Sequence, residues 1–367
     1  MPYDAPPSSP GGAWRGETYY GLPALKASPW DWKVSAYIFI AGLAGSAQII
    51  ATAADLFGGA RARGVVSRGR HLALLAPAVG GPLLIADLHT PQRFYNMFRI
   101  FRGTSPMSIG TYVLSGFSLF SIATVAGQFL ADRSGARRGS LPARAATAAQ
   151  LPAALAGAGM STYTAALLSA TSTPLWAAVP QPLAARFGCS SMATAAASLS
   201  LAERIDGGPE ENCRDLDRLA MLALAGEAVA TVACERRWRA AGIAGPDEGN
   251  ALHALGAALG IALPLACHAA NAARRRRSLG LSVLASLGVL AGGALMRHAV
   301  LKAGNRSAER PADYFRFASP RSAERGGDTA PRARGGGWQV RRVERAMPQP
   351  AAARAGAPAP IPEEQRR

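Results

Sequence analysis

The sequence predicts an all-α membrane protein: a polytopic bundle of about eight transmembrane helices, followed by a disordered C-terminal tail. Hydrophobic residues make up 49% of the 367 residues, and charged residues only 17%. The charges are unevenly distributed, because no Asp, Glu, Lys or Arg occurs in five intervals, 34–54, 103–131, 145–185, 249–273 and 278–296. A helix needs about 20 mostly apolar residues to cross the roughly 30 Å hydrocarbon core of a bilayer, and these intervals reach or approach that length.

Eight segments have the composition expected of membrane-spanning helices: 34–57, 72–88, 108–131, 146–170, 187–203, 217–235, 251–272 and 279–300. In hydrocarbon each backbone N–H and C=O needs a partner within the protein, which leaves only helices or closed barrels. The alternation of apolar and polar residues that marks barrel strands is absent. We therefore expect an N-terminal extramembrane segment, 1–32, a helical bundle, 33–303, and a tail, 304–367.

The predicted tail is rich in Arg, Pro, Ala and Gly, with 13 arginines against 7 acidic residues. Such a composition buries too little apolar surface to offset the entropy lost on ordering, so we expect disorder. The other arginines cluster between the apolar segments, as is typical of the flanks of membrane helices. Aromatic residues do not interleave with these clusters, so membrane lipid rather than nucleic acid is the expected partner. An excess of Lys and Arg in the odd-numbered loops predicts that these loops are cytoplasmic.

Neither an iron–sulfur cluster nor a haem is expected in this chain. The four cysteines are separated by 24, 21 and 33 residues, and iron–sulfur clusters are held by closely grouped thiolates. His253 and His298 would share a depth if the last two helices were antiparallel, and a haem needs such a pair. Each lies close to a helix end, where an imidazole can simply meet headgroup water, so we expect no metal site.

Acidic residues in the apolar segments point to proton movement. An ionised carboxylate is costly inside a bilayer and usually faces a partner or a water-filled cavity. Glu227 lies in the middle of the sixth segment, whereas Asp87 and Glu203 lie near the ends of theirs. We predict a proton relay that includes these three residues. The same pattern supports a different function, that of a transporter or proton-conducting membrane protein without a redox role.

Several ordered motifs resemble a known family of membrane proteins, the NrfD/polysulfide-reductase type integral membrane subunits. The resemblance runs from about Tyr19 to Phe317 and rests on YYGLPALK at 19–26, WDW at 30–32, DLHTPQRFYNM at 87–97, TSPMS at 104–108, YTAALLSAT at 163–171, PLW at 174–176 and AERPADYF at 308–315. The chain differs from the family pattern at His89 and Thr90, where Gly and Arg are usual, and in its long Arg-rich tail.

The resemblance implies a subunit of the cell inner membrane that interacts with a quinone, menaquinone or ubiquinone. Such a subunit exchanges electrons between the quinone pool and a ferredoxin-like iron–sulfur partner, which in turn serves a catalytic subunit, often of the molybdopterin type. The chain would then be a quinone-reactive part of an oxidoreductase complex rather than a stand-alone enzyme. The absence of cluster ligands agrees, because electrons would pass directly from the quinone to the partner's cluster.

A quinone site needs an apolar slot, hydrogen-bond donors for two carbonyl oxygens and a route for protons. Tyr163, within the fourth segment, can donate a hydrogen bond. By resemblance, Tyr163, Asp87 and Arg93 are predicted quinone contacts. Trp32 and Tyr37, at the start of the first segment, either wall the slot or belong to the aromatic belt at the membrane interface. The iron–sulfur partner is expected to dock on the same side, over the N-terminal segment, the 87–102 loop and the 174–176 loop.

Overall fold

The structure, a computed structural model, describes residues 23–133, 140–245, 251–274 and 277–318. All regular secondary structure in these ranges is helical. The principal helices, in chain order, are α1 (Trp32–Phe57), α2 (Arg63–Ala73), α3 (Gly81–Ala86), α4 (Pro106–Arg133), α5 (Leu141–Ser169), α6 (Pro174–Ala177), α7 (Pro180–Ile205), α8 (Glu210–Ala240), α9 (Ala251–Ala257), α10 (Leu263–Ala272), α11 (Leu279–Glu309) and α12 (Pro311–Ala318). Four short elements join them: η1 (Ala60–Ala62), η2 (Ala76–Gly80), η3 (Pro91–Phe98) and η4 (Ala258–Ala262).

Six helical segments are long and apolar enough to cross a membrane: Trp32–Phe57, Ala60–Ala86, Pro106–Arg133, Leu141–Ser169, Ala251–Ala272 and Leu279–Glu309. Two further long helices, α7 and α8, correspond to the fifth and sixth predicted segments. Together they give eight long helical segments within the described ranges. The prediction of an all-α, multi-pass membrane bundle is confirmed.

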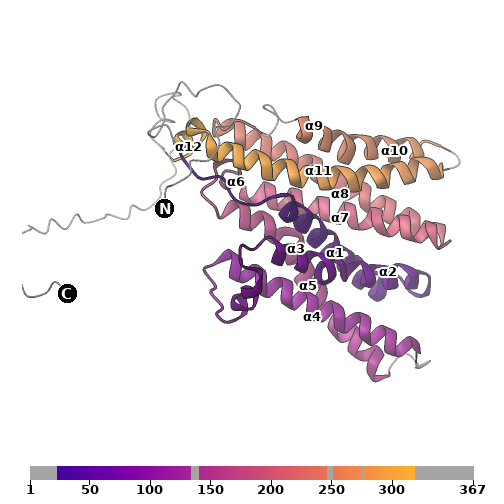
Figure 1. The fold of residues 1–367 in the computed structure, drawn as a ribbon. Helices are drawn as coiled ribbons and strands as arrows, with labels where there is room; N and C mark the ends of the chain where they lie inside the picture. The colour runs from indigo at the N-terminus through magenta and orange to yellow at the C-terminus, as the bar shows by residue number, and fades with distance from the viewer. Residues whose placement is uncertain (1–22, 134–139, 246–250, 275–276, 319–367) are drawn as a thin grey trace, which may run out of the picture. The chain divides into compact units, whose positions relative to one another are not determined.

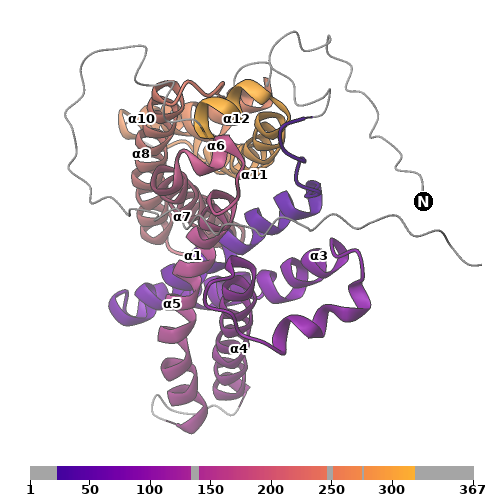
Figure 2. The same cartoon turned by 90° about the vertical axis from the view of Figure 1, so that its left-hand side faces the viewer.

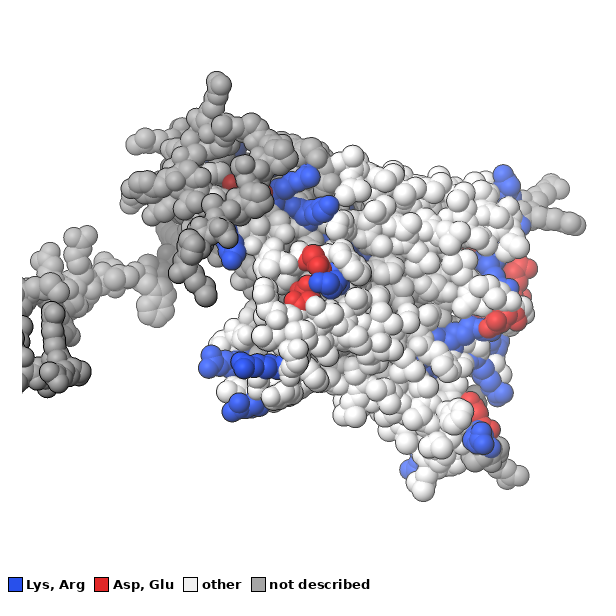
Figure 3. All heavy atoms as spheres, viewed as in Figure 1, with Lys and Arg blue, Asp and Glu red and all other residues white. Residues whose placement is uncertain are grey.

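The helices run side by side and alternate in direction, so their connections gather at two ends (Figure 1). We call one the Asp87 end (residues 23–31, 87–105, 170–179, 241–245 and 310–318) and the other the Arg61 end (residues 58–62 and 206–209, with the starts of α2, α5, α8 and α11). Most charged side chains on the face shown in Figure 3 lie toward these ends, and the surface between them is largely uncharged. This distribution is the one expected of a protein that meets water at both ends and lipid between them.

Helix α1 lies between two groups of helices, with α3, α4 and α5 on one side and α7, α8 and α11 on the other (Figure 2). In its most apolar stretch 78% of the residues are buried, compared with 22% for α4. Small residues allow its neighbours to approach closely, since a Cβ atom on Gly45 would overlap the backbone of Gly157 in α5. Small residues at helix contacts are the usual means of close packing in lipid.

This close contact predicts a loss of stability when Gly45 is replaced by Ala. The added methyl group must push α1 and α5 apart, and overpacking of this kind costs about 1–3 kcal/mol. Thermal unfolding of the detergent-solubilised protein measures the effect. Gly116→Ala in α4 is the matched control, because a Cβ atom there meets nothing within 4 Å. Removing a helical glycine at that position should stabilise the protein slightly. Equal stability of the two variants would contradict the packing described here.

Two boundaries differ from those expected. The second predicted segment begins at residue 72, but the helix in fact begins at Ala60 and includes most of the supposed Arg-rich loop. Arg70 explains this, because its buried guanidinium donates hydrogen bonds to Asp55, Gln128 and Gln150 and is not free in water. The tail was expected to be disordered from Gly304, but α11 continues to Glu309 and α12 follows. Residues 319–367 of that prediction lie outside the described ranges, as do residues 1–22 of the N-terminal segment.

Candidate functional site

A cluster of two carboxylates and one ammonium group lies at the Asp87 end. Asp31 is the N-cap of α1 and accepts a hydrogen bond from the backbone N–H of Lys33 at 2.7 Å. The Nζ atom of Lys33 lies 2.8 Å from Oδ2 of Asp31 and 3.8 Å from Oδ1 of Asp87. Asp87 follows the last residue of α3. The start of α1 and the end of α3 therefore place both acids around one cation.

The two carboxyl groups differ in acidity. Partial burial, reinforced by the charge of Asp31, raises the pKa of Asp87 above its usual value, while Lys33 and His89 oppose the rise. The pKa of Asp31 is lowered by the side-chain and backbone hydrogen bonds from Lys33. Groups whose environments push their pKa values apart are suited to distinct roles in proton transfer. Asp87 is therefore the carboxyl group of this pair better suited to take up and release a proton.

Tyr37 and Tyr163 lie deeper in the same part of the bundle. Tyr37 is one helical turn beyond Lys33 on α1, is buried, and lies within electrostatic range of Tyr163. The Tyr163 hydroxyl donates a hydrogen bond to the carbonyl of Pro106 at the start of α4. Its ring fills the space beside Gly110, where any side chain would overlap it. Two phenol groups thus follow the carboxylate cluster inward from the Asp87 end.

Two other predicted quinone contacts are exposed. Arg93 is exposed in η3, and the side chain of Trp32 is 60% exposed on the surface of α1. The exposed position of Trp32 agrees with its reading as a member of the aromatic belt. Trp30 has the inward position instead, because its ring stacks on Trp176 of α6 with centroids 5.9 Å apart. The quinone contacts themselves stay predictions.

A second polar site, here called the Glu227 centre, lies inside the bundle and consists of Arg186, Ser190, Ser191, Glu227, His253 and Arg297. Glu227 in α8 is buried, and the charges of Arg186 and Arg297 act on it. Arg297 in α11 donates hydrogen bonds to Ser190 Oγ at 3.2 Å and Ser191 Oγ at 2.8 Å. Its guanidinium also lies over the rings of Phe39 and Phe187, 5.6 Å from each centroid. Arg186 Nη2 lies 3.1 Å from His253 Nε2.

Sequence reasoning missed the two arginines of this centre. Arg186 was placed in the loop before the fifth segment, and Arg297, although it lies inside the eighth segment, was given no role. They are in fact 0% and 1% exposed, because α7 begins at Pro180 and α11 continues to Glu309. For Arg297, the available signal was its position inside the predicted segment 279–300, three residues before the end of that segment.

Glu203, the third predicted relay residue, belongs to a separate group at the Arg61 end. It is fully buried, forms an ion pair with Arg68 of α2, and accepts a hydrogen bond from the side-chain amide of Asn212 at 3.1 Å. These contacts join α2, α7 and α8. The structure therefore places Asp87, Glu203 and Glu227 in three different clusters.

The histidines and cysteines have separate surroundings. His253 meets Arg186, whereas Nδ1 of His298 lies 3.1 Å from the hydroxyl of Ser35. The four cysteines are free thiols. Within the described ranges, no three His, Cys, Asp or Glu side chains come together as a metal site.

The comparison with protein families agrees with this architecture. The model of the family described as polysulphide reductase, NrfD, matches residues 23–307. The chain belongs to the NrfD family. NrfD proteins are multi-pass membrane subunits of redox complexes that work with the quinone pool and are generally paired with iron–sulfur and molybdopterin subunits. No curated protein matches the chain. The resemblance found in the sequence motifs is confirmed, and the matched range includes the Glu227 centre and all of the Asp87 end except residues 310–318.

Proposed function

We propose that this chain is the quinone-reactive subunit of an inner-membrane oxidoreductase and passes electrons between menaquinone or ubiquinone and an iron–sulfur subunit bound at its Asp87 end. The observation that carries the proposal is the convergence of Tyr37, Tyr163 and Asp87 at one end of the bundle. Oxidation of a quinol releases two electrons and two protons, so the site needs both hydrogen-bonding groups and a proton acceptor. Two phenols and a carboxyl group with a raised pKa meet this need.

The same end offers a surface for the iron–sulfur subunit. The N-terminal segment is tied to α11 by a backbone hydrogen bond from Leu25 to Ala308, and Trp30 stacks on Trp176 of α6. η3 and the residues that follow it add three arginines, Arg93, Arg99 and Arg102, all of them exposed. A partner docked here would bring its cluster near a quinone held beside Tyr163, so electrons could pass without a redox centre in this chain. A molybdopterin subunit would complete the complex from beyond the iron–sulfur subunit.

Tyr163→Phe tests the site directly. The change removes only the hydroxyl that donates to Pro106, so quinol-dependent electron transfer in the assembled complex should fall about tenfold or more. The rate of quinol oxidation is measured in the assembled complex, and a pull-down checks that the iron–sulfur subunit is still bound. Tyr112→Phe is the matched control, because Tyr112 is exposed at the same end and its hydroxyl binds the carbonyl of Phe98. A wild-type rate in Tyr163→Phe would remove Tyr163 from the site.

Proton movement is a second activity, favoured by the Glu227 centre. Ionisable residues within the membrane are costly and usually have a function, and Glu227 is buried under the influence of Arg186 and Arg297. A redox subunit can also conduct protons, so we propose that Glu227 takes part in proton transfer coupled to quinone chemistry. If the chain instead purified without an iron–sulfur partner and moved a solute in liposomes, a non-redox transporter would be the better description.

A further inference from the structure

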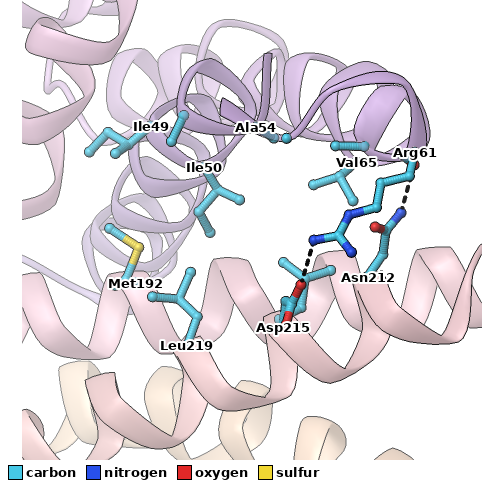
Figure 4. A pocket seen from close by; sticks show the side chains of 13 residues that line it. Ile49, Ile50, Ala54, Arg61, Val65, Met192, Asn212, Asp215 and Leu219 are labelled. Carbon is cyan, nitrogen blue, oxygen red and sulfur yellow. Dashed lines mark hydrogen bonds and ion pairs between the residues drawn. The ribbon is translucent and has the colours of Figure 1, made fainter. Parts of the chain in front are cut away.

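An apolar groove lies beside the last turns of α1, near the Arg61 end (Figure 4). It has a volume of about 340 Å³. Its walls come from α1, η1, α2, α7 and α8, and the deeper part is lined by Ile49, Ile50, Ala53, Met192, Leu216 and Leu219. Small side chains on α1, together with Gly58, leave the space open. The groove lies at the opposite end from Tyr163 and Asp87, so it is not part of the proposed electron-transfer site.

The mouth of the groove is polar. Arg61 Nη2 lies 3.2 Å from Oδ2 of Asp215, and Arg218 Nη1 lies 3.3 Å from Oδ1 of the same carboxylate. The side chains of Arg61 and Arg218 are 58% and 63% exposed. Asn212 donates a hydrogen bond to the backbone carbonyl of Arg61 and thereby holds η1 against α8. Two guanidinium groups share one carboxylate, so the mouth carries a net positive charge.

The groove also has the length of one membrane leaflet. Ile49 and Gly58 mark its two limits on α1, and nine residues of helix rise about 13 Å. Half of the roughly 30 Å hydrocarbon core is about 15 Å. An acyl chain that begins at the headgroup level would therefore reach the inner limit of the groove.

We propose that the groove binds one phospholipid, with an acyl chain in the apolar part and the phosphodiester at Arg61 and Arg218. Paired arginines at the membrane surface suit a phosphate oxygen, because the guanidinium group donates several hydrogen bonds in one plane. The Arg61 end belongs to the odd-numbered loops, whose basic residues predict the cytoplasmic side, and the phospholipids of that leaflet attract such residues. The bound lipid would fill the space between α1 and α8 and support their contact at this end.

The proposal is tested by measuring the lipid that remains bound to the purified full-length protein. After extensive washing in detergent, organic extraction and mass spectrometry should give about one phospholipid per wild-type chain. Ala53→Phe fills the groove and should reduce this number to the background level. Ala123→Phe, on the exposed face of α4 and away from the groove, is the matched control and should keep the lipid.

A second variant keeps the test valid if the groove-filling change unfolds the protein. Arg61→Gln combined with Arg218→Gln leaves the apolar lining intact and should weaken phospholipid binding about tenfold in a titration with lipid added back in detergent. Arg239→Gln, at the Asp87 end, should have no effect on binding. Unchanged lipid content in Ala53→Phe, an unchanged affinity in the Arg variant, or recovery of a quinone instead of a phospholipid would each overturn the proposal. None of these measurements depends on quinol oxidation.

Discussion

Replacing Asp87 by Asn should lower quinol-dependent electron transfer by at least a hundredfold while the complex still assembles. The amide has nearly the shape of the carboxyl group but cannot take up a proton from the quinol, and positioned acid–base groups contribute about 10²–10⁴-fold to rate. Lys33 keeps its ion pair with Asp31 in this variant, so the start of α1 should remain in place. The rate is measured in the assembled complex with a soluble quinol.

Asp206→Asn provides the control for Asp87→Asn. Asp206 lies at the Arg61 end, where its side chain is largely exposed and pairs with Arg68. This variant should oxidise quinol at the wild-type rate. If both variants were as active as the wild type, Asp87 would have no role in proton uptake, even if the Tyr163→Phe result still supported a quinone site.

The pH dependence should identify the same carboxyl group. Burial and the nearby Asp31 raise the pKa of Asp87 above 3.8, and only the ionised form can accept a proton. The rate should therefore rise with pH through this raised pKa and then level off, and Asp87→Asn should lack that rise. The free energy of unfolding should change in the opposite direction. Because the folded state holds the Asp87 proton more tightly than the unfolded state, the contribution of Asp87 to this free energy decreases as pH rises through the same range. Asp87→Asn should thus unfold no more easily than the wild type at neutral pH.

Replacing Glu227 by Gln should destabilise the protein by about 3–5 kcal/mol. The change leaves Arg186 and Arg297 buried without the negative charge between them, and breaking a buried ionic group by removing one partner has a cost of this size. Thermal unfolding in detergent measures it. Adding Arg297→Met should recover part of the loss, because one buried positive charge is then removed together with its partner.

Glu235→Gln, on the same helix, is the control: it removes the same charge from a site near the surface and so shows how much of the loss depends on burial. Glu235 pairs with Arg239 near the surface, and such pairs contribute about 0–1 kcal/mol. A loss below 1 kcal/mol for Glu227→Gln, with no coupling to Arg297→Met, would contradict the Glu227 centre as described. The double variant also tests proton transfer: if Glu227 carries protons, proteoliposomes with the double variant should oxidise quinol without the coupled proton movement expected of the wild type.

The sequence alone was sufficient for the all-α, multi-pass fold, because apolar length is a local property. The roles of Asp87, Tyr163 and Glu227 stay predictions. The sequence was insufficient for buried charged side chains whose partners come from distant parts of the chain. Arg70 and Arg186 lay in predicted loops, yet both are buried, and Gln150, a partner of Arg70, lies 80 positions away in the chain. Arg297 lay inside a predicted segment, but its partner Ser190 is 107 positions away and could not be identified from the sequence. The helical run 304–318 was missed because its composition resembles that of the tail, whereas its order depends on contacts such as Leu25 with Ala308.

The central position of α1 has a consequence for biogenesis. Translation delivers this helix to the bilayer before α5 and α7, but its buried face carries Gln48 and Thr52, and Thr52 donates a hydrogen bond to the backbone of Gln150 in α5. Until α5 and α7 have been synthesised, these groups must face lipid, the translocation machinery or each other. The nascent N-terminal half therefore cannot complete its folding until the later helices are made. A product released by a ribosome that stalls after α4 should be degraded by membrane quality-control proteases.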